Sequence, residues 1–226
     1  MTRLQSEILR LYLTPDQEGI AAGPGGRVRA MVLELAGPTS WAALSKVWQG
    51  VQADLDLPAP AIAVSGMHGH QLWFSLREPV PVAQATAFLA ALRTRYLGGV
   101  ARERIAIAQP ARVPPVEAAP RHWAAFLAPD LASLFDDEPW LDLPPSDDAQ
   151  ANLLSQLQSM KPEDFRRASE RLLPLAEART GDTSVAEGLE PRRFLLQVMN
   201  DSSVELHLRI AAAKALLPYF EGEHRP

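Results

Sequence analysis

The side chains best suited to chemistry gather in one stretch, residues 61–76, which reads AIAVSGMHGHQLWFSL. His68, His70, Gln71 and Trp73 lie close together there, beside a glycine-rich turn between two short apolar runs. Polar and aromatic groups at such a turn either bind a ligand or satisfy buried polar groups of the protein itself. The sequence leaves both possibilities open.

His68 and His70 form an H-x-H pattern. Imidazoles two residues apart on a strand point the same way and can share a metal ion. Glu34, the one acid in the apolar run 27–35, is the nominated third ligand, and a metal-dependent hydrolase is one hypothesis for such a site. Because strand alternation places His70 and Glu34 on opposite faces, ordinary turn or partly buried histidines are the competing interpretation.

The elements that must position these groups follow a regular order along the chain. Runs of β-forming residues alternate with helical i, i+3, i+4 patterns. We expect a strand, a helix, a hairpin, a second helix and a last strand at residues 27–35, 41–55, 61–76, 82–97 and 104–108. This β-α-β-β-α-β order predicts an α+β fold with a ferredoxin-like core, in which the first and third strands are central and both helices cover one face.

Strand alternation also predicts the composition of the face that lies away from the helices. It would carry a few polar or aromatic groups over a floor of small residues, namely Glu34, Ser65, Gln71, Trp73, Ser75 and Arg104. This face is either an open binding platform or is covered by the rest of the chain. Arg104 is expected to pair with Glu34, unless Glu34 is catalytic. Trp73 either stacks on a base or anchors the covering segment.

Composition divides the chain into three regions. Residues 1–110 form the predicted α+β domain, which begins with a short helix carrying Leu4, Ile8 and Leu11. Residues 111–145 are a Pro-rich connector that wraps across the sheet, and residues 146–226 are a small all-α region. In that last region we expect helices to start near Ser146, Pro162 and Pro191.

Charge and cysteine usage narrow the functional classes. The 226-residue chain has a formal net charge of −5 and no cysteine. Net acidity argues against a general nucleic-acid coating protein, because phosphate neutralisation supplies most non-specific affinity. The absence of cysteine excludes disulfides and thiolate metal sites. No signal peptide and no membrane-spanning apolar run is apparent, so we expect a cytoplasmic protein without a membrane partner.

Two segments, VLELAGP (32–38) and SGMHGHQLWFSL (65–76), are each followed by a helical pattern. They resemble the catalytic core of archaeo-eukaryotic primases and primase-polymerases. The resemblance implies an RRM-like core, a divalent metal (Mg²⁺ or Mn²⁺), and single-stranded DNA or nucleotides as partners. The binding residues it suggests are Ser65, Gly66, Gln71, Trp73 and Arg104. The suggested metal ligands are Glu34, His68 and His70, with Glu34 also the candidate catalytic acid.

The chain departs from the primase pattern at three points. The family has two metal-binding acids two residues apart, whereas Glu34 is followed here by Ala36. No third acid can be assigned in the last strand, and Gln71 stands where the family's nucleotide-contacting histidine would fall. Because two-metal nucleotidyl transfer needs carboxylates to hold both cations, a degenerate member without polymerase activity is expected.

The final helical segment, residues 191–220, resembles a part of phage terminase small subunits. Both resemblances imply a role in phage or mobile-element replication or packaging, with self-association or another protein bound through the C-terminal helices. The alternative is a non-catalytic interaction or structural protein whose sheet face is sealed by residues 123–140. These two functions differ in whether Trp73 is open to solvent.

Overall fold

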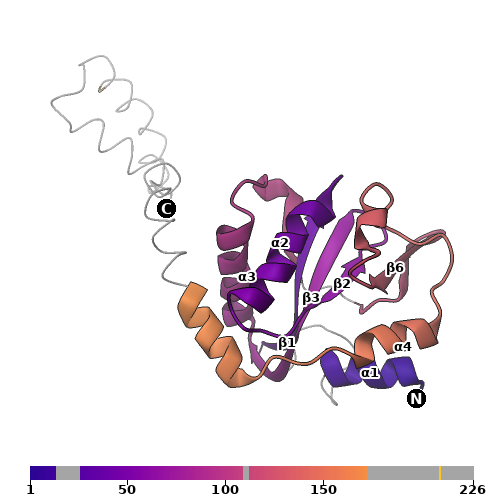
Figure 1. The fold of residues 1–226 in the computed structure, drawn as a ribbon, viewed down its shortest axis with the longest axis horizontal. Coiled ribbons are helices and arrows are strands. Elements are labelled where there is room, and N and C mark those ends of the chain that lie inside the picture. Colours follow the sequence, from indigo (N-terminus) through magenta and orange to yellow (C-terminus); the bar gives the residue numbers. More distant parts are fainter. Residues whose placement is uncertain (14–25, 109–111, 173–208, 210–226) are drawn as a thin grey trace, which may run out of the picture. The chain divides into compact units, whose positions relative to one another are not determined.

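The centre of the protein is an antiparallel sheet of six strands in the order β4-β1-β3-β2-β6-β5. The computed structural model describes residues 1–13, 26–108, 112–172 and 209 (Figure 1). The long strands β1 (Arg27–Ala36) and β3 (Gly69–Pro81) are neighbours in the middle of the sheet. Strand β4 (Ile105–Ala108) flanks β1, and β2 (Ala61–Val64) flanks β3. The chain is therefore α+β, as predicted.

Helices α2 (Ser40–Ala53) and α3 (Val82–Tyr96) pack on one face of this sheet. The strand residues that face them are the apolar rows expected from alternation, and they form the larger hydrophobic core with the helices. Leu33 and Leu72, directly opposite each other on β1 and β3, are fully buried there. The larger core therefore lies where the period-two pattern placed it.

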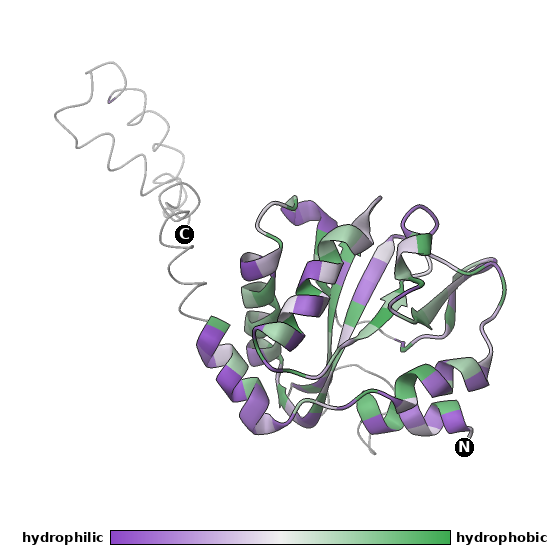
Figure 2. Ribbon diagram, viewed as in Figure 1, coloured by the Kyte–Doolittle hydropathy of each residue, from purple (hydrophilic) through white to green (hydrophobic). Residues whose placement is uncertain are grey.

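The opposite face is covered as well. Helices α1 (Arg3–Leu11) and α4 (Asp147–Ser155) contact each other and close a second core over β1 and β3 (Figure 1). Both helices carry purple and green residues in Figure 2, as expected for elements with one buried side. Leu4 and Leu11 of α1 and Leu154 of α4 supply buried side chains. The sheet is therefore a middle layer between two helical layers.

The predicted connector at residues 111–145 does not simply wrap the sheet. Part of it forms a hairpin, β5 (Val116–Ala119) and β6 (His122–Leu127), and β6 pairs with β2 and lengthens the sheet. The short helical turn η2 (Ala132–Phe135) then packs against α2 and β2. Residues 123–140 therefore do not seal the face that α1 and α4 cover, and the prediction for them was wrong in this respect. Phe126 alone joins the second core.

The boundary expected at residue 146 also differs from the structure. Contacts divide the chain into residues 1–176 and 177–226. Helix α4 packs on β6, and residues 162–172 are helical, with Phe165 inserted beside Phe88 of α3 at a ring-centroid distance of 5.1 Å. The apolar faces of α4 and of the helical residues 162–172 complete the cores of the first unit. A short amphipathic helix is stabilised mainly by burying its apolar face. The helices expected near Pro191 and beyond lie outside the described residues.

Candidate functional site

Three of the predicted site residues lie side by side on the face covered by α1 and α4. Glu34 and Gln71 are direct cross-strand partners, and Trp73 follows Gln71 by two residues on β3. The Gln71 Nε2 donates to Glu34 Oε2 at 2.8 Å, and the Trp73 indole N–H donates to Gln71 Oε1 at 2.9 Å. The shared face predicted from strand alternation is confirmed. The three side chains form one hydrogen-bonded row, which we call the Glu34–Gln71–Trp73 row.

Burial increases along this row. Glu34 is half-buried, Gln71 is 7% exposed and Trp73 is 1% exposed. Tyr12 and Phe126 enclose the indole, with ring centroids 5.4 Å and 5.9 Å away in edge-on contacts. No face of Trp73 is left for a base to stack on, because stacking requires contact between exposed π surfaces. The indole is the anchor of a covering layer.

Helix α1 is fastened to this face by polar contacts as well. The Ser75 hydroxyl donates to the Leu11 carbonyl at 2.6 Å, and Arg29 donates to the carbonyls of Leu13 at 2.7 Å and Leu76 at 3.0 Å. The Leu11 and Leu13 carbonyls lie at and just after the C-terminal end of α1, where a helix leaves carbonyls without internal partners, and the Leu76 carbonyl belongs to β3. The cover is therefore held by directed bonds as well as by apolar packing.

Arg104 does not pair with Glu34, contrary to prediction. It belongs to the 3₁₀ turn η1 (Arg102–Arg104), and β4 begins one residue later, with Ala106 opposite Glu34. The Arg104 guanidinium instead donates to the carbonyls of Ala36 and Pro38, both at 2.8 Å. The guanidinium has five N–H donors, and carbonyl oxygens that a chain turn presents in the right geometry can satisfy them. Gln71 takes the place beside Glu34.

The two histidines have different environments and do not form a shared site. His68 is exposed in the turn of the hairpin. His70 is fully buried on the α2 side of the sheet, so it and Glu34 are on opposite faces. Among the described residues, no group of three or more acids and histidines is placed to hold a metal ion.

His70 is instead the centre of a second polar cluster. Its Nδ1 is 2.7 Å from the hydroxyl of Ser40, at the start of α2, and its Nε2 is 2.8 Å from the carbonyl of Ala132 in η2. A carbonyl only accepts, so Nε2 carries the proton and the Ser40 hydroxyl donates to Nδ1. Burial lowers the pKa of His70, while the Ala132 carbonyl and Asp136, 3.8 Å from Nδ1, act in the opposite direction. We call this the Ser40–His70–Ala132 cluster.

A serine beside a histidine has the composition of a catalytic nucleophile and its general base. The Ser40–His70–Ala132 cluster shares only that composition. Ser40 and His70 are both 0% exposed, so no substrate reaches the hydroxyl. The interactions connect three elements that are distant in sequence, since α2, β3 and η2 each contribute one group. The side chain of Asp136 adds a fourth link by accepting from the Trp41 backbone N–H at 2.8 Å. The cluster therefore positions η2 against the sheet.

Ser65 and Gly66 build the hairpin turn. The Ser65 hydroxyl accepts from the backbone N–H groups of His68 and Gly69 at 2.7 and 3.0 Å. Gly66 has a φ of +80°, and a Cβ there would lie 2.7 Å from Ala118 and 2.9 Å from the Ala124 nitrogen. A larger residue at 66 would therefore displace the β5–β6 hairpin. Both residues have a structural use that needs no nucleotide.

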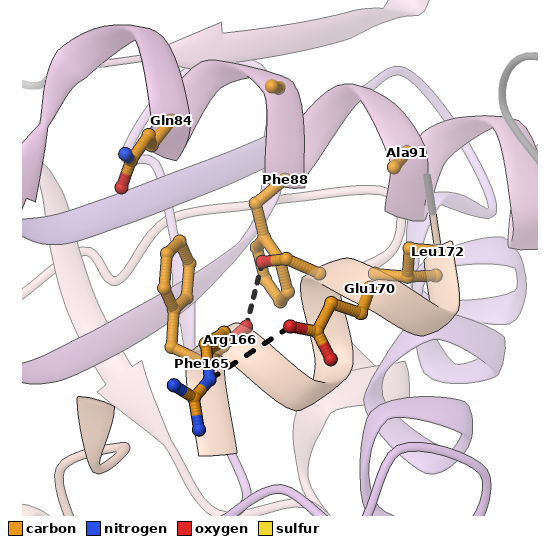
Figure 3. A pocket seen from close by; sticks show the side chains of 9 residues that line it. Gln84, Phe88, Ala91, Phe165, Arg166, Glu170 and Leu172 are labelled. Atoms are coloured by element: carbon orange, nitrogen blue, oxygen red, sulfur yellow. Dashed lines mark hydrogen bonds and ion pairs between the residues drawn. The ribbon is translucent and has the colours of Figure 1, made fainter. Parts of the chain in front are cut away.

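Two of the concave surfaces in the described part of the chain lie away from these residues, and the sequence signalled neither. The first, of about 320 Å³, lies between α3 and the helical residues 162–172, where Phe88 and Phe165 form an apolar wall (Figure 3). Its rim carries Arg166 and Glu170, 3.9 Å apart and both largely exposed. The second, of about 410 Å³, lies between Leu134 and Pro145. The first surface joins two segments that are distant in sequence and meet only after folding, whereas the second is lined by one continuous segment, residues 134–145.

No protein-family model and no curated protein sequence matches this chain. Within the described residues, no helix has the length and apolarity needed to cross a bilayer.

Proposed function

We propose that this chain is a non-catalytic protein-interaction module. The observation that carries the proposal is the enclosure of Trp73, which is 1% exposed between Tyr12 and Phe126. In a sheet that reads nucleic acid, aromatic side chains of the central strands must be open for bases to stack. Here the equivalent face is covered by α1 and α4, so what the protein offers to partners is its outer surface.

A ferredoxin-like or RRM-like core is part of the proposal. The chain order β1-α2-β2-β3-α3-β4 and the spatial order β4-β1-β3-β2 support it, because a split βαβ unit places its first and third strands in the centre. In this proposal α1, α4 and the β5–β6 hairpin are additions to that core. Descent from a primase-like ancestor stays a prediction, and the replacement of the second acid by Ala36 supports a non-catalytic descendant.

The outer surface has features suited to binding proteins. Leu134 and Leu143 are each 73% exposed, and both line the same concave surface. Exposed leucines that occur singly are common, but a cluster of them beside aromatic residues is typical of an interaction site. Self-association through the C-terminal helices would involve residues outside the described part of the chain.

A second candidate function is the binding of nucleotides or single-stranded DNA with Mg²⁺ or Mn²⁺. It is favoured by one observation, the partial opening of the covered face at Glu34. That carboxylate is half-buried and its cross-strand neighbour Ala106 is exposed, so a cation could reach it. A single carboxylate holds at most one cation weakly, which makes binding more plausible than transfer chemistry in this proposal.

A titration distinguishes the two functions. Labelled single-stranded DNA and nucleotides are added to the full chain with and without Mn²⁺, at low and at raised salt, while fluorescence anisotropy is recorded. The interaction function predicts no salt-dependent binding, since the net charge is −5 and the aromatic platform is closed. Salt-dependent binding that the Glu34→Gln variant abolishes would replace the interaction function with the nucleotide-binding one.

A further inference from the structure

The concave surface between residues 134 and 145 combines exposed apolar groups with acids. Leu134, Leu143 and the partly buried Trp140 lie among its lining residues, together with the exposed acids Glu138 and Asp142. Its volume is about 410 Å³. We call it the acidic groove.

The segment that forms the acidic groove carries charge of one sign. Residues 128–148 contain no Lys, Arg or His, and their acids are Asp130, Asp136, Asp137, Glu138, Asp142, Asp147 and Asp148. Asp136 accepts from the Trp41 backbone N–H. In the described part of the chain, no Lys or Arg forms an ion pair with Glu138 or Asp142. The groove thus keeps a negative charge that no ion pair within the described residues neutralises.

The backbone beneath the groove is fixed. Leu141 exchanges two backbone hydrogen bonds with Trp123 of β6, at 2.9 and 3.1 Å, and the Pro139 carbonyl accepts from Gly66 N–H at 3.0 Å. The Trp140 ring stacks on His122 with centroids 4.2 Å apart. Leucines held outward on a rigid backbone lose little entropy when a partner covers them, which favours binding.

We propose that the acidic groove docks a segment of another protein in which apolar side chains are flanked by Lys or Arg. This inference rests on the proposed interaction function and names its partner class. Charge complementarity identifies the occupant, because a basic segment pairs with Glu138 and Asp142 while its apolar residues cover Leu134 and Leu143. Nucleic acid is disfavoured, since the same acids repel phosphate.

The test uses the full chain and two labelled synthetic peptides with identical leucine positions, one with Lys and the other with Glu at the flanking positions. Fluorescence anisotropy should show binding of the Lys peptide alone. Raising the salt from about 50 mM to about 300 mM should weaken that binding several-fold, because exposed charge pairs are screened.

Two double variants locate the site. Leu134→Ser with Leu143→Ser should weaken binding about ten-fold or more, as expected when central apolar contacts are lost. Glu138→Gln with Asp142→Asn should weaken it less, and should remove most of the salt dependence. The matched controls are Leu131→Ser, at an exposed leucine outside the groove, and Glu103→Gln with Glu163→Gln, which removes two exposed acids elsewhere.

Controls that bind like the wild type, together with weakened groove variants, support the proposal. Equal affinity in all variants, or no binding of the Lys peptide, overturns the acidic groove as a docking site. Neither result contradicts the broader interaction function. That function is tested separately, and salt-dependent binding of single-stranded DNA would contradict it. Circular dichroism of each variant confirms that the fold is retained.

Discussion

Each face of the sheet carries a hydrogen-bonded network of polar side chains, and the two networks differ in their exposure to solvent. On the α2 side, the Ser40–His70–Ala132 cluster is closed, with Ser40 and His70 both 0% exposed. On the α1 side, the Glu34–Gln71–Trp73 row runs from a buried indole to a half-buried carboxylate. A closed cluster offers no group to a solute in the folded state, and it acts on stability and on the pH dependence of stability. The row keeps one end within reach of a solute.

The largest effect is expected from removing the indole at the buried end of the row. Trp73→Ala should lower the free energy of unfolding by about 3–5 kcal/mol, because a large core side chain is lost and a cavity remains. Denaturant unfolding followed by circular dichroism measures it. Trp140→Ala is the comparison, since Trp140 is only partly buried at the surface. If both variants lost equally little stability, the α1 side would not be a sealed core.

The closed cluster should respond to pH. Burial lowers the pKa of His70 below 6.5, so below that pH the unfolded chain binds more protons than the folded one. Stability is then complete above about pH 6.5 and declines toward the folded pKa by at most about 1.4 kcal/mol per pH unit. His70→Gln should be less stable at neutral pH and should lack this decline.

The measurement is denaturant unfolding of wild type and His70→Gln at several pH values between about 7.5 and about 5.5, which bracket the free histidine pKa. His68→Gln is the control, because His68 is exposed and its loss should leave the slope unchanged. A wild-type slope equal to that of His70→Gln would mean that the closed cluster does not titrate with folding.

A smaller loss is expected at Gln71, in the middle of the row. Gln71→Met keeps the side-chain length but leaves the buried Trp73 N–H without its acceptor, which should cost about 1–3 kcal/mol. Glu34→Gln should cost less than about 1 kcal/mol, because the carboxylate is half-buried and water can replace its partner. Thermal unfolding of both variants measures the two stability losses. A larger loss for Glu34→Gln than for Gln71→Met would show that the contribution of these residues does not follow their burial.

The smallest effect, and one of opposite sign, is expected at Tyr12. Its hydroxyl is buried without a hydrogen-bond partner among the described residues, and burial raises its pKa. Tyr12→Phe removes a group that lost its water without compensation, so it should stabilise the protein by about 1 kcal/mol or less. Tyr12→Leu, which also removes the ring contacts to Trp73, should destabilise it. A destabilised Tyr12→Phe would indicate that the hydroxyl has a partner.

The predictable parts of the fold were the order of the elements and the face of the sheet toward which each strand residue points. Residues 27–35 and 82–97 were expected as a strand and a helix, and they form β1 and α3 with small shifts at their ends. Hairpin β5–β6 was missed because residues 111–121 are rich in proline, which usually marks a loop or an edge strand. Strand β5 is such an edge strand.

Within the candidate site, the sequence predicted that Glu34, Gln71 and Trp73 share a face, but it paired Glu34 with the wrong residue. The error at Arg104 came from a boundary, since β4 starts at Ile105 and the guanidinium turns toward two carbonyls. Element boundaries are the least predictable part of a sequence-based assignment. The stripe of Leu4, Ile8 and Leu11 was the signal that α1 needs an apolar surface to cover.

The sequence by itself determined which side chains share a face, because side chains on a strand alternate with a period of two residues wherever the strand is placed. It also determined the net charge and the run of acids from 130 to 148. Only the tertiary structure decided that α1 and α4 close over Trp73 and that Leu134 and Leu143 border one groove. Helices α1 and α4 reach Trp73 from distant parts of the chain, whereas Leu134 and Leu143 are close in sequence and are brought to one groove by the conformation of the segment between them. Both arrangements depend on the packing of whole elements, which local patterns do not encode.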